Sequence, residues 1–242
     1  LDEYFGRVTG RMVVRQPLEL TELLQGWGAT GPDGQAGFDA RLPEWDTYLE
    51  WLLANRQNGM EWFLLWADSW KDFADGPLRQ QRLSTLVSRA HQFGVKVGLD
   101  VPIVFGQQHA FRLLRTQNKN DEAAELTELR SRMDYVLSAG FDFLGTESGT
   151  SEFTAPDAQR MLDWMNEVSR YADSKYHVPV YIKCHASAGQ VAQGFPDPTT
   201  GQDINFNFLP HFADSKLGVL PHTVEMYGLH DPAPTYGNTD FR

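Results

Sequence analysis

Two carboxylates that end strand-like segments are the residues of this 242-residue chain best placed to do chemistry. Asp100 follows the apolar run VKVGL, and Glu147 ends the run FDFLGTE. Glycoside hydrolysis needs such a pair, because one carboxyl group protonates the leaving oxygen while the other acts as nucleophile or activates water. We therefore expect Glu147 to be the general acid, with a pKa raised by a poorly solvated site and by the negative charge of Asp100.

The identity of the second carboxylate stays open between three residues. Asp100 is one candidate, because a charged group at the end of an apolar strand is costly unless it is paired or near water. Glu225 lies in a weaker strand-like segment, 217–227, and Glu152 follows Glu147 in a segment that is typical of a loop or a helix start. Glu147, Asp100 and Glu225 form the predicted catalytic set.

Other polar and aromatic residues lie where strand-like segments end, and we expect them to bind substrate. Trp66 and Trp70 are candidate platforms for a sugar ring, whereas Trp45, Trp51, Trp62 and Trp164 fall on faces predicted to be core. Lys183 is predicted to bind a hydroxyl or carboxylate, with a Schiff base as the alternative. The predicted substrate-binding set is Asp68, Trp66, Trp70, Lys183, His185 and His222.

Side-chain alternation predicts which of these residues share a face of their strand. Phe143, Gly145 and Glu147 lie on one face, so Glu147 is predicted to point into the interior of a barrel. On the next strand the same count turns Cys184 away from Lys183. The single cysteine is therefore interpreted as a small buried hydrophobe rather than a nucleophile.

Two other functions compete with glycoside hydrolysis. A glycan-binding or scaffold barrel without catalysis is the first alternative. A metal-dependent hydrolase that uses His185, His222 and Asp100 is the second, although the chain has no HExxH motif. Our prediction includes neither a metal ligand set nor a cofactor.

Helical and strand-like segments alternate along the chain from about residue 45, which predicts an α/β fold of repeated βα units in a parallel, TIM-barrel-like arrangement. The predicted helices span 44–57, 78–93, 121–138 and 156–174. The predicted strands span 60–67, 95–104, 141–147 and 178–187, with weaker candidates at 11–15 and 217–227. A closed barrel needs eight strands, so we expect residues 1–242 to be one incomplete barrel domain from a longer chain, with its last strands missing or irregular.

The charge of the chain restricts its partners. A formal net charge of −11 without a basic cluster argues against nucleic acid, and no apolar run is long enough to predict membrane insertion. We expect a carbohydrate substrate and, from that, an extracellular or periplasmic location. The oligomeric state is left open.

Residues 45–150 resemble part of the barrel of β-hexosaminidases and α-glucuronidase-like enzymes. The run from Asn58 to Trp70 is similar to the second-strand region of these enzymes. The run VKVGLDVP is similar to their strand that ends in Asp-x-Pro, and FLGTE is similar to their strand that ends in Gly-x-Asp-Glu. The resemblance implies that Glu147 is the general acid, Asp100 a site carboxylate and Trp70 a sugar contact. Thr146 stands where hexosaminidases have an aspartate that orients the N-acetyl group, which argues against their substrate-assisted mechanism.

Overall fold

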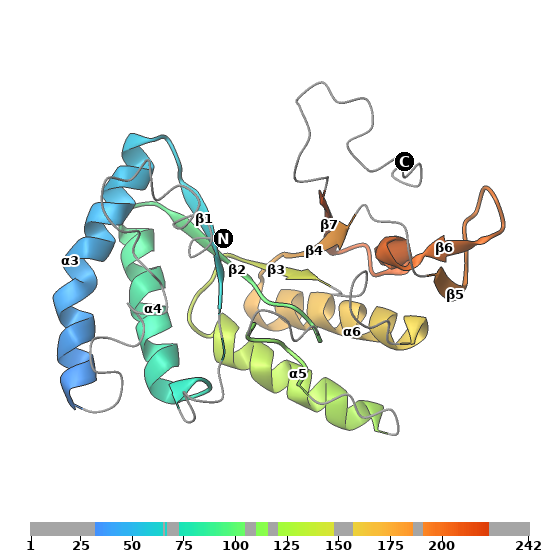
Figure 1. Cartoon of the computed structure of the whole chain (residues 1–242), viewed down its shortest axis with the longest axis horizontal. Coiled ribbons are helices and arrows are strands. Elements are labelled where there is room, and N and C mark those ends of the chain that lie inside the picture. Colours follow the sequence, from blue (N-terminus) through green and yellow to red (C-terminus); the bar gives the residue numbers. More distant parts are fainter. Residues whose placement is uncertain are drawn as a thin grey trace. The chain divides into compact units, whose positions relative to one another are not determined.

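The computed structural model describes residues 32–64, 66, 73–104, 110–115, 121–147, 157–185 and 191–222, with the backbone alone at 32–33, 185 and 221–222. Helices and strands alternate over most of this range, as predicted (Figure 1). The helical elements are α3 (Pro32–Ala54), α4 (Pro77–Gln92), α5 (Glu122–Leu137), α6 (Ala158–Tyr171), η3 (Ala172–Tyr176) and η4 (Phe206–Phe212). The strands are β1 (Gly59–Phe63), β2 (Lys96–Asp100), β3 (Phe143–Glu147), β4 (Val180–His185), β5 (Val191–Pro196), β6 (Asp203–Asn205) and β7 (Leu217–His222). In the described helices, no segment is long and apolar enough to cross a membrane.

Five of the strands form one parallel sheet in the order β1-β2-β3-β4-β7. β1 pairs with β2 from Gly59 opposite Lys96 to Phe63 opposite Asp100. The sheet and its alternating helices confirm the predicted α/β class with parallel βα units. Closure into a barrel stays a prediction, and the candidate strand at 11–15 lies outside the described residues.

The described chain divides into two compact units. The first contains α3, β1, α4, β2 and residues 132–144, while the second contains residues 112–115, 121–131 and all described residues from 145 onward. The expectation of one barrel domain over residues 1–242 stays a prediction.

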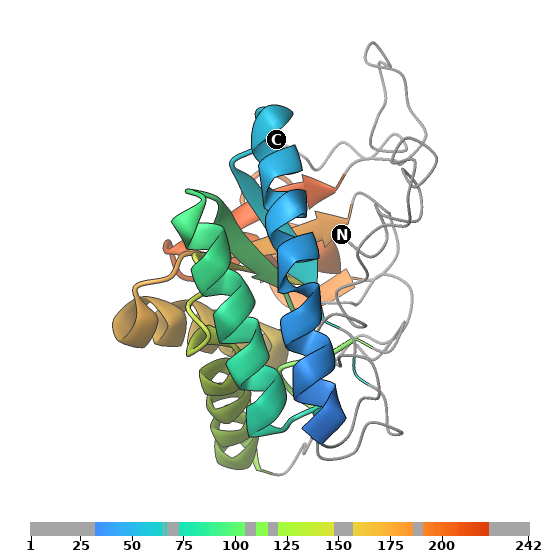
Figure 2. The same cartoon turned by 90° about the vertical axis from the view of Figure 1, so that its left-hand side faces the viewer.

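Tryptophan packing forms the core of the first unit. Trp45 of α3 and Trp62 of β1 are buried, with ring centroids 5.5 Å apart, and Trp62 meets Phe141 edge-on at 5.3 Å. The Trp45 indole Nε1 donates to the Leu86 carbonyl of α4 at 3.2 Å. This bond fastens α3 to α4, which lie side by side in both views (Figures 1 and 2).

α3 begins at Pro32, twelve residues before the start predicted at residue 44. The buried stripe of Phe38, Trp45, Leu49 and Leu52 has helical spacing and continues into this segment. Burial of that stripe outweighs the poor helix propensity of the local glycines and of Pro43. Trp51, predicted to be core, lies off the stripe and is 44% exposed.

A buried carboxylate links α5 and α6 in the second unit. Glu125 is 2% exposed and accepts from the Trp164 indole at 3.1 Å, while Arg160 Nε lies 3.2 Å from the same oxygen. α6 buries Trp164, Met161, Met165 and Val168 on one face. Pairing and hydrogen bonding make the burial of the Glu125 charge tolerable.

The segment between β4 and β7 contains structure that the sequence did not predict. β5 and β6 form a small antiparallel sheet, and η4 follows them before β7 returns parallel to β4. Phe195 of β5 packs against Phe212 of η4 with ring centroids 5.2 Å apart. These elements stand where a βα repeat would place an α-helix.

Gly98 of β2 lies directly under the Phe143 ring, and a Cβ there would come within 2.0 Å of ring carbons. We expect Gly98→Ala to lower the free energy of unfolding by about 1–3 kcal/mol, because the ring must move out of a packed position. Gly59→Ala is the matched control in β1, where the nearest atom outside its chain neighbours is 3.7 Å away, and should change stability by less than about 0.5 kcal/mol. Urea unfolding monitored by circular dichroism compares the two; equal losses would contradict the packing argument.

Cys184 is 3% exposed in β4, and burial raises the pKa of its thiol to about 12, so the interpretation as a buried hydrophobe is confirmed. Because the thiolate is the reactive form, we expect the folded protein at pH 8 to react with a disulfide reagent only as it unfolds. The native thiol also stays protonated between the unfolded pKa near 9 and the folded value, so its contribution to stability is lost as the pH rises through this window. Colorimetric thiol titration with and without denaturant measures the reactivity of this one thiol. Full labelling of the native protein within seconds would contradict the expected protection.

Candidate functional site

Glu147 ends β3 as predicted and is 8% exposed. Its main-chain carbonyl accepts from the Ile103 amide at 3.2 Å, which fixes the backbone at the strand end. The Glu147 carboxylate Oε2 lies 3.6 Å from the Lys183 Nζ of β4. The structure thus brings together two of the predicted site residues in the second unit.

The Glu147–Lys183 pair sets the electrostatics of this strand end. At 3.6 Å it is an ion pair longer than an ordinary hydrogen bond. The Glu147 side chain is 11% exposed and that of Lys183 is 38% exposed, so the ammonium is open to solvent while the carboxylate is largely withdrawn from it. Positive charge beside a desolvated carboxylate offsets the cost of burying it and favours its charged form. Such a carboxylate suits attack on carbon, proton abstraction or hydroxyl binding.

Lys183 reaches this position because of the alternation along β4. Ile182 and Cys184 are buried, while Tyr181 is 36% exposed and its ring lies over Gly218 of β7, where a Cβ would come within 2.5 Å. Tyr181 and Lys183 thus lie on the face opposite Cys184, as predicted. An aromatic ring over a neighbouring strand glycine packs the sheet while leaving ring surface exposed.

His185 and His222 end β4 and β7 and are register partners in the parallel pair. That the two residues share a site stays a prediction. Their side chains are outside the described residues. Among the side chains that are described, no group of three or more metal-ligating residues gathers.

Asp100 and Trp66 lie at strand ends of the first unit. Asp100 ends β2, is partly exposed and has one buried carboxylate oxygen, Oδ1. Trp66 is partly exposed, and its indole Nε1 donates to Asp75 Oδ2 at 3.3 Å. Asp100 as the second carboxylate and Trp66 as a sugar platform stay predictions. Four further candidates lie outside the described residues: Asp68, Trp70, Glu152 and Glu225.

Asp75, which accepts from the candidate residue Trp66, and its partner Arg132 were not among the predicted residues. Arg132 is 7% exposed and its Nη1 lies 3.2 Å from Asp75 Oδ1. The signal was available for Arg132, since it falls on the apolar stripe of Leu129, Met133 and Val136 in α5. A charge at a core-facing helix position needs a partner, which could have prompted a search for an acidic residue.

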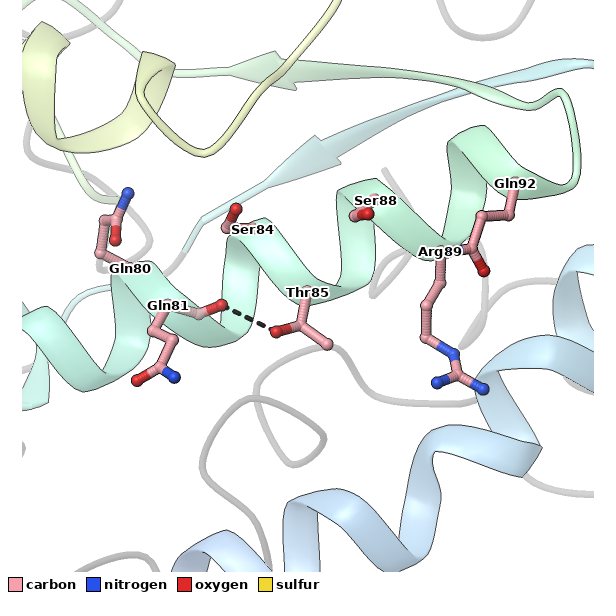
Figure 3. A pocket seen from close by; sticks show the side chains of 7 residues that line it. All are labelled: Gln80, Gln81, Ser84, Thr85, Ser88, Arg89 and Gln92. Atoms are coloured by element: carbon pink, nitrogen blue, oxygen red, sulfur yellow. Dashed lines mark hydrogen bonds between the residues drawn. The ribbon is translucent and has the colours of Figure 1, made fainter.

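A shallow polar hollow lies away from the strand ends, on the outer face of α4 (Figure 3). It is lined by Gln80, Gln81, Ser84, Thr85, Ser88, Arg89 and Gln92. Its side chains include no carboxylate and no histidine, and the Thr85 hydroxyl is bonded to the Gln81 carbonyl at 3.0 Å. Arg89 is committed to a bidentate pair with Asp46 of α3. These contacts describe a solvated helix surface.

No protein-family model matches the chain. A mutant of the Thermobaculum terrenum O-GlcNAc hydrolase is 13% identical, with a TM-score of 0.47 over 73% of this chain and 37% of that one. CpGH84D is 8% identical, with a TM-score of 0.48 over 74% of this chain and 28% of its own. CpGH84B is 11% identical, with a TM-score of 0.48 over 76% of this chain and 30% of its own. The match spans 28 to 37% of these glycoside hydrolases, and likeness at this level assigns no activity to the chain.

Proposed function

We propose that the protein hydrolyses glycosidic bonds in a poly- or oligosaccharide, with Glu147 as the catalytic acid/base. The observation that carries this proposal is the largely buried Glu147 carboxylate at the end of a parallel strand, 3.6 Å from the Lys183 ammonium. Active sites of parallel α/β enzymes lie at this end of the strands. A carboxylate is retained in such a desolvated position at a cost, which supports a functional role.

Lys183 has a definite part in the proposed reaction. Its ammonium stabilises the carboxylate form of Glu147, the form that takes a proton from water, and its partly exposed side chain could donate from Nζ to a sugar hydroxyl. A hydroxyl bound there would lie beside the Glu147 carboxylate. In the protonated form Glu147 would deliver its proton to the leaving oxygen, and as the carboxylate it would draw a proton from the attacking water.

The second carboxylate is proposed to be Asp100 or Glu225. Asp68, Trp66, Trp70, His185 and His222 are proposed to surround the sugar. Their polar groups would bind hydroxyls, and the indoles would offer apolar faces to the ring.

Substitution of Glu147 by Gln tests the proposal, since it removes the ionisable group while keeping side-chain size. We expect turnover on a soluble oligosaccharide panel to fall roughly 10²- to 10⁴-fold, with binding largely kept. Glu128→Gln is the matched control, because Glu128 also pairs with a basic side chain at 3.6 Å, that of Arg115. Reducing-sugar release gives turnover and isothermal titration gives affinity. Wild-type turnover that survives Glu147→Gln would remove Glu147 from catalysis, and glycan binding without turnover in wild type would favour a non-catalytic glycan-binding protein.

A metal-dependent hydrolase is the second candidate, favoured by the register pairing of His185 with His222 at the strand ends. Two imidazoles on adjacent parallel strands have the spacing to share one ion with a carboxylate. In that case Zn²⁺ should bind with one-to-one stoichiometry, and His185→Asn should weaken it at least about 10-fold. His177→Asn, just before β4, is the control. Isothermal titration with Zn²⁺ that gives the same affinity for all three proteins would dismiss this candidate.

A further inference from the structure

The Trp66 indole is anchored through its ring edge. Its indole Nε1 donates to Asp75 Oδ2 at 3.3 Å, nine residues further along the chain, and the side chain remains partly exposed. Trp66 follows the end of β1, where a side chain would meet substrate in a parallel α/β enzyme. This hydrogen bond lies at the ring edge, so it does not itself use either face of the indole.

Arg132 holds the Asp75 carboxylate. Its Nη1 lies 3.2 Å from Asp75 Oδ1, so the two carboxylate oxygens are divided between the guanidinium and the indole. The Arg132 side chain is 9% exposed, and its guanidinium carbon lies 4.0 Å from the centre of the Phe111 ring. A guanidinium fixed by an ion pair and an aromatic face has little freedom to reorient.

Phe111 and Tyr135 connect this cluster to both flanks of the segment from residue 64 to 76. The Phe111 amide donates to the Leu64 carbonyl at 2.8 Å, and its ring stacks on Tyr135 with centroids 5.6 Å apart. The Tyr135 hydroxyl donates to the Gly76 carbonyl at 3.1 Å, and burial raises its pKa to about 12, so this donor keeps its proton. Trp66 is therefore positioned by a continuous series of contacts.

These contacts do not by themselves require a buried charge. Leu129, Met133 and Val136 around Arg132 on α5 are fully buried, and an apolar residue at position 132 would fill the same stripe without desolvating a cation. The buried charge of Arg132 is explained if the Asp75 carboxylate must be held at one position. The indole that Asp75 binds is that of the partly exposed Trp66.

We propose that Arg132, acting through Asp75, is a positioning residue that holds Trp66 as the platform on which a sugar ring of the substrate stacks. This inference rests on the proposed function, because it takes the ligand to be a glycan. The apolar C–H face of a pyranose would lie on a face of the partly exposed indole, and its hydroxyls would point to solvent or to polar residues. Arg132 itself does not touch the substrate in this arrangement.

Three variants test the proposal in the full chain: Trp66→Ala, Arg132→Met and Asp75→Asn. The probes are chitotetraose, cellotetraose, xylotetraose and maltotetraose, with affinity from isothermal titration and the tryptophan indole N–H groups followed by ¹H–¹⁵N NMR. We expect Kd for the bound glycan to rise roughly 3- to 10-fold in all three variants, as loss of an aromatic contact would give. In Arg132→Met and Asp75→Asn the Trp66 indole signal, identified by its loss in Trp66→Ala, should move, and KM should rise with kcat within about 2-fold.

Arg130→Met is the matched control, because Arg130 lies on the same helix and pairs with Glu167 outside this cluster. It should leave the affinity and the Trp66 signal unchanged. Asp75→Asn keeps side-chain size at a partly exposed position, so it tests the proposal even if Arg132→Met fails to fold. An unchanged Kd in Trp66→Ala and Asp75→Asn, with glycan bound by wild type, would overturn the positioning role and leave the hydrolase proposal standing. Glycan binding that depends on Trp66 and Asp75 but brings no turnover would support the platform and refute hydrolysis, and absence of binding to every probe would overturn the inference.

Discussion

Parallel pairing of very short strands is the constraint on which the rest of the structure depends. The strands of the main sheet contain five or six residues each, so every backbone amide and carbonyl they bury must find its partner on the adjacent strand within that length. Register then determines which residues end the strands together, as with His185 and His222. In so short a strand only a few residues separate the buried core from the strand end, where the polar side chains lie. The chemistry proposed for Glu147 and Lys183 is a direct result of this geometry.

Elements with a clear apolar period could be predicted from sequence, and those formed against local propensity could not. The helix at 78–93 and the strand at 141–147 match α4 and β3 closely, because their burial pattern and their preferred residue types agree. The first turns of α3 contain glycines and Pro32, so their helical state depends on burial of Phe38 in the unit as a whole. β5, β6 and η4 depend on contacts such as Phe195 with Phe212, which have no local signature.

Site residues were predictable to the extent that strand position alone determines them. Glu147 of β3 and Lys183 of β4 contact each other near the ends of their strands. Alternation correctly predicted that Lys183 and Cys184 lie on opposite faces of β4. Alternation did not predict the sign of the charge beside Glu147. Asp100 was expected to lie beside Glu147 and stays a prediction, and the charge that the structure places there is the Lys183 ammonium. The Arg132–Asp75 pair joins residues 57 positions apart, and no spacing rule connects them.

The β5–β6 ribbon between β4 and β7 has a practical consequence for studying this protein. Its turn is closed locally, by Asp197 side-chain bonds to the Thr199 and Thr200 amides and by a bond from the Gly201 amide to the Asp197 carbonyl, and its residues are exposed. A turn that satisfies its own backbone tolerates added chain better than one that packs on the sheet. A fluorophore or affinity tag inserted at Thr200 would therefore report on the protein without entering either the core or the strand ends.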